Sequence, residues 1–141
     1  MRNIILSIKP VFSDQIYQGN KIVELRKKIG KEFQPGQKIY IYTSSPVKSL
    51  TGTAQIRKVE QVPVSKIRSH YLDNAGISAP ELDAYYDGKT HGYLIWLKNV
   101  MRFKASIPLS ELKTIGFTAP QSFGYATSAF LKLLDDHSIE Q

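Results

Sequence analysis

The sequence contains no cysteine, and this absence removes several classes of chemistry at once. Disulfide bridges, thiolate zinc sites, iron–sulfur clusters and cysteine nucleophiles are all excluded. Histidine is also scarce, and its three positions do not have the HxH or HExxH spacing of a metal site: His70, His91 and His137. The sequence therefore predicts no metal site and no cofactor, and it leaves the participation of a divalent metal open.

Long apolar runs are missing as well. No stretch approaches the roughly 18 residues that a membrane span needs, and the first residues lack the apolar segment and cleavage site of a signal peptide. We therefore expect a soluble, cytoplasmic protein with no membrane partner. With 141 residues, 42% hydrophobic and 22% charged, the chain has the composition of one globular domain over residues 1–141. Nothing in the pattern indicates an oligomeric state.

Positive charge is unevenly distributed along the chain. The first 60 residues hold eleven Lys or Arg and four Asp or Glu, whereas residues 61–141 hold eight of each sign. The whole formal net charge of +7 therefore belongs to the amino-terminal part. Such a segment is typical of a protein that binds a polyanion, although a generic basic surface has the same composition. We expect the partner to be RNA or a nucleotide, with single-stranded RNA favoured.

Hydrophobic periodicity predicts the first elements. Residues 2–8 are apolar and β-branched, which predicts a buried strand, and residues 10–18 carry the apolar stripe of a helix that Gly19 ends. From residue 21 onward the period is two. This alternation places Glu24 and Arg26 together on the exposed, charged face of a strand.

The rest of the sequence adds strands around a helical insertion. Alternation puts Tyr40 and Tyr42 on one strand face. For Tyr42 both base stacking and burial remain open, whereas Trp96 is expected in the core. Gly52 marks a bulge or a close backbone approach. The further predicted elements are strands over 38–43, 47–62 and 90–104, helices within 63–88 that include a capping box at Ser78 and Glu81, and a last amphipathic helix opened by Pro120. About six strands with three or four peripheral helices favour a small α+β barrel.

Four charged residues near the first predicted helix form a candidate site. Lys9 and Lys21 flank the two ends of that helix, while Glu24 and Arg26 share a strand face. Cations so placed are able to hold a phosphate while Glu24 orients them. The competing interpretation is an ordinary surface ion pair worth less than about 1 kcal/mol, and spacing alone favours neither.

The run ILSIKPVFSDQIYQGNKIVELRKK, residues 5–28, resembles the opening of the ASCH domain family in the PUA-like superfamily of RNA-associated β-barrels. The features that carry the resemblance are Ile8-Lys9-Pro10, the helix, the pattern Gly19, Lys21, Glu24, Arg26, and later Pro35-Gly36 and Gly52. The resemblance implies a PUA-like β-pseudobarrel with a cleft beside the first helix. Lys21, Glu24 and Arg26 would line that cleft, with Lys21 and Arg26 on phosphate and Lys9 adding positive field.

The resemblance also implies an amidohydrolase as one alternative. Some relatives deacetylate N4-acetylcytidine with a lysine at the position of Lys21 and a nucleophilic threonine three residues further on. Glu24 occupies that second position here, which counts against this activity. A carboxylate is a poor nucleophile for amide hydrolysis, although beside a lysine it is able to act as general base for a water.

A ribonuclease is the other alternative, because some ASCH-like proteins resemble nucleases of single-stranded RNA. Tyr42, Lys48 and Ser122 would supply proton transfer and phosphate stabilisation, with Ser122 at the opening of the last helix. The competing interpretation makes them an exposed strand tyrosine, a solvated lysine and a helix cap. RNA or nucleotide binding, in RNA metabolism or the regulation of gene expression, is therefore expected first, then RNA cleavage, then deacetylation. An interaction module that tunes transcription or translation without chemistry is a third possibility. The candidate ligand-binding residues are Lys9, Lys21, Glu24, Arg26, Tyr42 and Lys48, and the candidate catalytic residues are Lys21, Glu24, Tyr42, Lys48 and Ser122.

Overall fold

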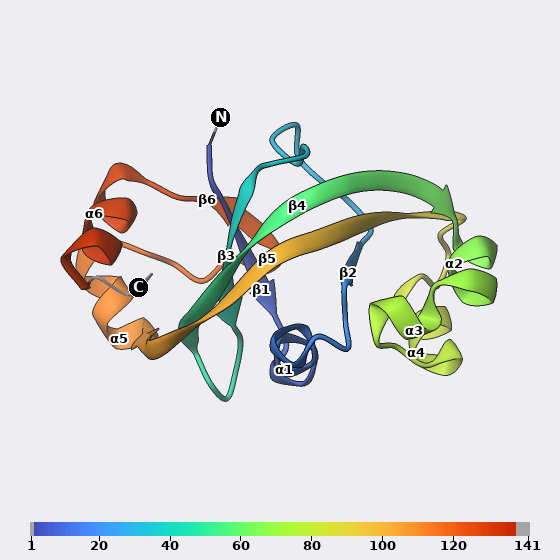
Figure 1. Cartoon of the computed structure of the whole chain (residues 1–141), viewed down its shortest axis with the longest axis horizontal. Helices are drawn as coiled ribbons and strands as arrows, with labels where there is room; N and C mark the ends of the chain where they lie inside the picture. The colour runs from blue at the N-terminus through green and yellow to red at the C-terminus, as the bar shows by residue number, and fades with distance from the viewer. Residues whose placement is uncertain (1, 138–141) are drawn as a thin grey trace.

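Six strands form one mixed, curled sheet in a computed structural model that describes residues 2–137 (Figure 1). The spatial order is β2-β5-β4-β3-β1-β6, so β2 and β6 are the two edges. Only β1 and β3 pair in parallel; the other neighbours are antiparallel. The strands are β1 (Ile4–Ile8), β2 (Val23–Arg26), β3 (Lys38–Thr43), β4 (Ser49–Pro63), β5 (His91–Pro108) and β6 (Phe123–Tyr125). The expected six-stranded α+β pseudobarrel is confirmed.

Helices gather at three places around the sheet (Figure 1). α2 to α4 lie at one end of the long antiparallel pair β4 and β5, α5 and α6 lie at the other end, and α1 follows β1. They are α1 (Pro10–Gln18), α2 (Val64–His70), α3 (Leu72–Ala75), α4 (Ala79–Tyr85), α5 (Leu109–Leu112), the 3-10 helix η1 (Lys113–Ile115) and α6 (Ser128–His137). Within residues 2–137 there are thus six α-helices where three or four were predicted, because the insertion breaks into three short ones. None of them is long and apolar enough to span a membrane.

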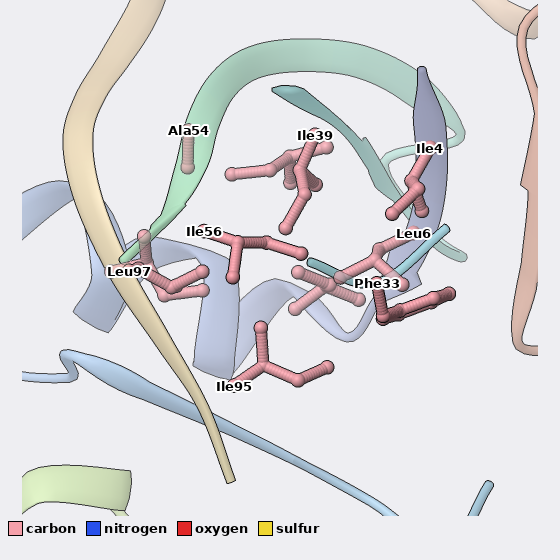
Figure 2. Close-up of a cluster of buried hydrophobic side chains, with 11 residues drawn as sticks. Ile4, Leu6, Phe33, Ile39, Ala54, Ile56, Ile95 and Leu97 are labelled. Carbon is pink, nitrogen blue, oxygen red and sulfur yellow. The ribbon is translucent and has the colours of Figure 1, made fainter. Parts of the chain in front are cut away.

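The strands β1 and β3 are buried on both faces. Ile4 and Leu6 point into one core, which Figure 2 shows with their neighbours from β3, β4 and β5. Ile5 and Tyr40 point into a second core on the opposite face, where Phe130 of α6 packs edge-on against Tyr40 with ring centroids 5.3 Å apart. The prediction that Tyr40 and Tyr42 share a face is confirmed, and α5 and α6 cover that face.

A third core lies under the helical insertion and supports β2. Its members include Val23, Leu25 and Trp96, together with apolar residues from α2 to α4. Trp96 is 8% exposed, which confirms its assignment to the core. The prediction that Glu24 and Arg26 lie on an exposed strand face was wrong: each is only 7% exposed.

The approach to the last helix also differs from the prediction. Phe123 belongs to the edge strand β6, which pairs antiparallel with β1, and α6 begins only at Ser128. Ser122 therefore directly precedes a strand and does not open the last helix. A local pattern of apolar residues did not distinguish this short strand from the first turn of a helix.

The orientation of α1 is set by a chain of buried hydroxyl groups. Tyr17 Oη lies 2.6 Å from Thr51 Oγ1, which lies 2.8 Å from Thr43 Oγ1, and Thr43 donates to Ser13 Oγ over 3.1 Å. Gly52 is required beside this chain, because a Cβ there would collide with Tyr17 Oη and with the Met101 carbonyl oxygen. The predicted close backbone approach at Gly52 is confirmed, and it holds α1 against β4.

Candidate functional site

A cleft of about 770 Å³ opens where the two edges of the sheet approach each other. Its walls are the end of β1 and the start of α1, the segment 21–28 that contains β2, the loop between β3 and β4, and residues 119–122 before β6. Ile77, Tyr85 and Lys89 of the helical insertion complete it. Seven Lys or Arg side chains line this cleft, and Glu24 is the only carboxylate among its lining residues.

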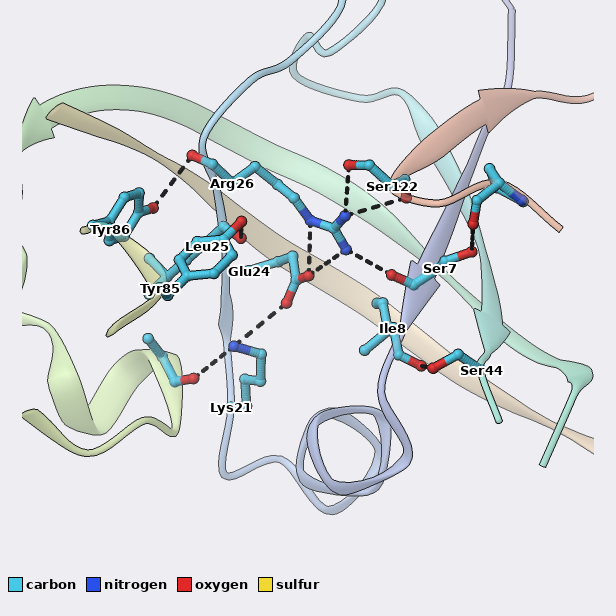
Figure 3. Close-up of polar contacts among 12 residues, drawn as sticks. Ser7, Ile8, Lys21, Glu24, Leu25, Arg26, Ser44, Tyr85, Tyr86 and Ser122 are labelled. Carbon is cyan, nitrogen blue, oxygen red and sulfur yellow. Dashed lines mark hydrogen bonds and ion pairs between the residues drawn. The ribbon is translucent and has the colours of Figure 1, made fainter. Parts of the chain in front are cut away.

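The side chain of Arg26 links the two edges of the sheet (Figure 3). We call the line along which Arg26 of β2 meets Ser7 of β1 and Ser122 the seam. The Nε and Nη2 atoms of Arg26 donate to Glu24 Oε2 over 3.0 and 2.6 Å. Nη2 also donates to the Ser7 carbonyl oxygen of β1 over 2.9 Å, and Nη1 donates to the Ser122 carbonyl oxygen and Oγ over 3.2 and 3.0 Å. A guanidinium has five N–H donors, and here all five have protein acceptors.

Lys21 and Glu24 are buried with Arg26. Lys21 Nζ donates to the Ala75 carbonyl oxygen over 2.6 Å and lies 3.4 Å from Glu24 Oε1. Burial raises the pKa of Glu24, but the charges of Arg26 and Lys21 outweigh it, so the pKa lies below its ordinary value and the carboxylate is ionised. Burial also lowers the pKa of Lys21, against the opposing attraction of Glu24.

The free edge of β2 is covered by the helical insertion. Tyr85 and Tyr86 donate their hydroxyl protons to the carbonyl oxygens of Leu25 and Arg26 over 3.3 and 3.2 Å. Figure 3 shows the two rings side by side next to β2. Because these hydrogen bonds replace a neighbouring strand, β2 is fixed in place along with Arg26.

Five exposed lysines carry the accessible positive charge of the cleft, and no carboxylate that the structure describes lies within ion-pair distance of any of them: Lys9, Lys27, Lys28, Lys48 and Lys89. The ammonium of Lys27 lies 4.5 Å from the centre of the Tyr85 ring. Lys27, Lys28 and Lys89 were absent from the predicted site. Lys27 and Lys28 directly follow Arg26, and this run of positive charge was the sequence signal that could have identified them. No sequence signal pointed to Lys89.

Tyr42, Lys48 and Ser122, far apart in sequence, all line this cleft. Tyr42 is 2% exposed and packs against Phe117 with ring centroids 5.7 Å apart, so the competing interpretation of an exposed strand tyrosine was wrong. Its hydroxyl has no hydrogen-bond partner among residues 2–137, and burial raises its pKa. Lys48 lies in the β3–β4 loop with a left-handed φ of 50°. Every predicted site residue thus lines one cleft, although Lys21, Glu24 and Arg26 are buried in its wall.

The described residues contain no group of three or more side chains arranged to hold a metal ion. Glu24, the one carboxylate in the cleft, has both oxygens engaged by Lys21 and Arg26.

The curled mixed sheet, closed at its seam beside α1, defines a PUA-like domain. Human THYN1 protein, solved in complex with 5-methylcytosine-containing DNA, shares this fold at a TM-score of 0.57 and 14% identity, over 100% of this chain and 99% of that one. A serine-to-alanine variant of an ASCH protein from Zymomonas mobilis is much more similar: the TM-score is 0.88 and the identity 27%, over 96% of both chains.

Sequence comparison identifies the family. A family model described as a domain of unknown function (DUF365) matches residues 1–117. A protein from Zymomonas mobilis named ASCH domain-containing ribonuclease is 30% identical over 123 residues, which cover 86% of this chain and 82% of the relative. The chain therefore belongs to the ASCH domain family, as its opening motif indicated.

Proposed function

We propose that this protein binds single-stranded RNA in the cleft and cleaves it. The observation that carries the proposal is that five exposed lysines line one cleft together with Tyr42, whose hydroxyl has no hydrogen-bond partner among the described residues. The relative named as a ribonuclease, 30% identical, supports the same reaction class.

The lining of the cleft suits a single strand better than a duplex. Its lysines offer charge to a phosphate backbone, while Phe12, Leu25 and Ile77 offer apolar surface. The bases of a single strand are free to reach such a surface, whereas a duplex presents its phosphates and keeps its bases stacked inside. Binding should therefore weaken steeply with added salt, because each neutralised phosphate releases counterions.

Cleavage of an RNA phosphodiester requires a nucleophile, a proton for the leaving oxygen and stabilisation of the charge that develops on the phosphorus-bound oxygens. The nucleophile in this proposal is the ribose 2′-hydroxyl of the RNA: its oxygen bonds to phosphorus, its proton passes to solvent water, and the bond from phosphorus to the 5′ oxygen breaks, which leaves a 2′,3′-cyclic phosphate and a 5′-hydroxyl. Tyrosine is protonated at neutral pH, and burial raises the pKa of Tyr42 further, so its hydroxyl keeps its proton until negative charge develops on the leaving oxygen, to which it then donates. Solvent afterwards restores the proton of Tyr42. The ammonium of Lys48 and the hydroxyl of Ser122 line the same cleft and are suited to the phosphate oxygens. Deacetylation is a weaker candidate for two reasons. Glu24 stands where the deacetylating relatives have a nucleophilic threonine, and its carboxylate is engaged by two cations.

Incubation of the purified full chain with end-labelled single-stranded RNA, with and without added divalent metal ions, tests this function. We expect shortened products, an about 10²-fold slower reaction for Tyr42→Phe and Lys48→Ala, and little change in RNA affinity for Tyr42→Phe. Tyr93→Phe and Lys98→Ala are matched controls, because neither residue lines the cleft. RNA that stays intact in every condition would refute cleavage, and an affinity that does not respond to salt would refute the binding mode.

A further inference from the structure

Ser122 and Arg26 both line the cleft, and they differ in how far they are exposed. Ser122 is exposed, whereas Arg26 is 7% exposed and donates from Nη1 to both the carbonyl oxygen and Oγ of Ser122. A ligand in the cleft therefore has more access to Ser122 than to the guanidinium of Arg26.

The guanidinium has no spare donor for such a ligand. Two of its N–H groups are held by Glu24 Oε2, which fixes the plane of the group, and a third is held by Ser7 on β1. The last two go to Ser122. A phosphate that binds Arg26 directly would have to displace one of these acceptors, and so weaken either the support from Glu24 or one of the contacts to Ser7 and Ser122 that link the edges of the sheet.

The same hydrogen bonds determine what the Ser122 hydroxyl is able to do. Its oxygen accepts a hydrogen bond from a cation, so its own proton points elsewhere, and no acceptor for that proton exists among the described residues. A hydroxyl whose oxygen already accepts from a cation is polarised, which makes it a weaker base and a stronger donor. Ser122 is therefore suited to donate a hydrogen bond and poorly suited to act as a nucleophile.

We propose that Glu24 and Arg26 are positioning residues, which close the seam and hold the Ser122 hydroxyl as a hydrogen-bond donor to a non-bridging phosphate oxygen of bound RNA. The exposed lysines carry the phosphate charge. This assignment rests on the proposed function, because RNA is its ligand, and it departs from the expectation that Arg26 itself contacts phosphate.

The salt dependence of RNA affinity distinguishes a residue that contacts phosphate directly from one that positions Ser122. For single strands, the slope of log affinity against log salt falls by about 0.7 for each phosphate that the protein no longer neutralises. With a short oligouridylate as the probe, we expect Arg26→Gln to keep the wild-type slope and Lys48→Gln to lower it by about 0.7. Lys98→Gln, outside the cleft, is the control for a general reduction of positive charge.

A double-mutant cycle between Arg26 and Ser122 supplies a second measurement. If Arg26 acts through Ser122, Arg26→Lys should slow cleavage about 10²-fold in the wild type and cause no further loss in the Ser122→Ala background. Arg26→Lys keeps the charge beside Glu24, so it serves also if thermal melting shows that Arg26→Gln does not fold. The same cycle, measured on RNA affinity, applies if the wild type binds without cleaving.

The possible outcomes separate this inference from the proposed function. Wild-type protein that does not bind RNA removes the proposed function and the positioning role with it. Two results would overturn the positioning role alone, provided that the wild type binds RNA. One is a salt slope that falls as far for Arg26→Gln as for Lys48→Gln. The other is a double mutant whose loss of cleavage rate equals the product of the losses of the two single mutants. An unchanged slope and non-additive losses support it.

Discussion

Replacing Glu24 by alanine is expected to cost about 3–5 kcal/mol of folding free energy. The carboxylate is the counter-ion of both Lys21 and Arg26, at 3.4 and 2.6 Å, and their side chains are 3% and 9% exposed. Without it, two cations remain buried beside each other with nothing to compensate the loss of hydration. For a chain of this size the loss corresponds to a melting temperature lowered by roughly 10–20 °C.

The control is an ion pair of the same chemistry on the surface. Lys58 and Glu60 lie 3.0 Å apart, but their side chains are 49% and 31% exposed, so Glu60→Ala should cost less than about 1 kcal/mol. Thermal and urea unfolding of the full chain, followed by circular dichroism, measure both variants. Adding Lys21→Met to Glu24→Ala should recover part of the loss, because it removes one uncompensated charge. Equal losses for Glu24→Ala and Glu60→Ala would refute the buried network.

Two further predictions concern the same fold. The folded pKa of Glu24 lies below its ordinary value of 4.5, so its stabilisation is complete above that pH and is lost as the pH falls through the folded pKa. Glu24→Gln should therefore flatten the acid limb of a stability–pH curve, and an unaltered limb would contradict the assignment. Gly52→Ala should destabilise the fold by about 1–3 kcal/mol, because its methyl group meets Tyr17 Oη and the Met101 carbonyl oxygen. Gly124→Ala, with its nearest neighbouring atom at 3.8 Å, should melt near the wild type.

Features that depend on neighbouring residues were readable from the sequence. Pro10 opens α1 and Gly19 ends it in a left-handed conformation with φ 85°, because each residue has a backbone preference that needs no distant partner. Ser78 and Glu81 form the predicted capping box of α4. The same holds for the opening motif, whose residues lie within one short run and identify the ASCH family.

Burial of the motif required the tertiary structure. Alternation in β2 shows that Glu24 and Arg26 share a face. The same sequence pattern is expected for a polar face that contacts water and for one that packs against another element. In the folded chain Ser7 and Ser122 supply the acceptors, and they are 19 and 96 residues away from Arg26. No local pattern records such partners.

The placement of Tyr42 and Lys89 in the cleft also depends on tertiary packing. Tyr42 was recognised as a candidate from its residue type, yet its burial depends on Phe117 and on the helices that cover the outer face of β3. Lys89 enters the cleft only because the insertion folds back over β2. The sequence by itself determined most of the elements, the basic character and the family, although it missed the edge strand β6. Which charges face a ligand and which hold the seam together was decided by the tertiary structure, because hydrogen bonding and desolvation depend on groups that meet only after folding.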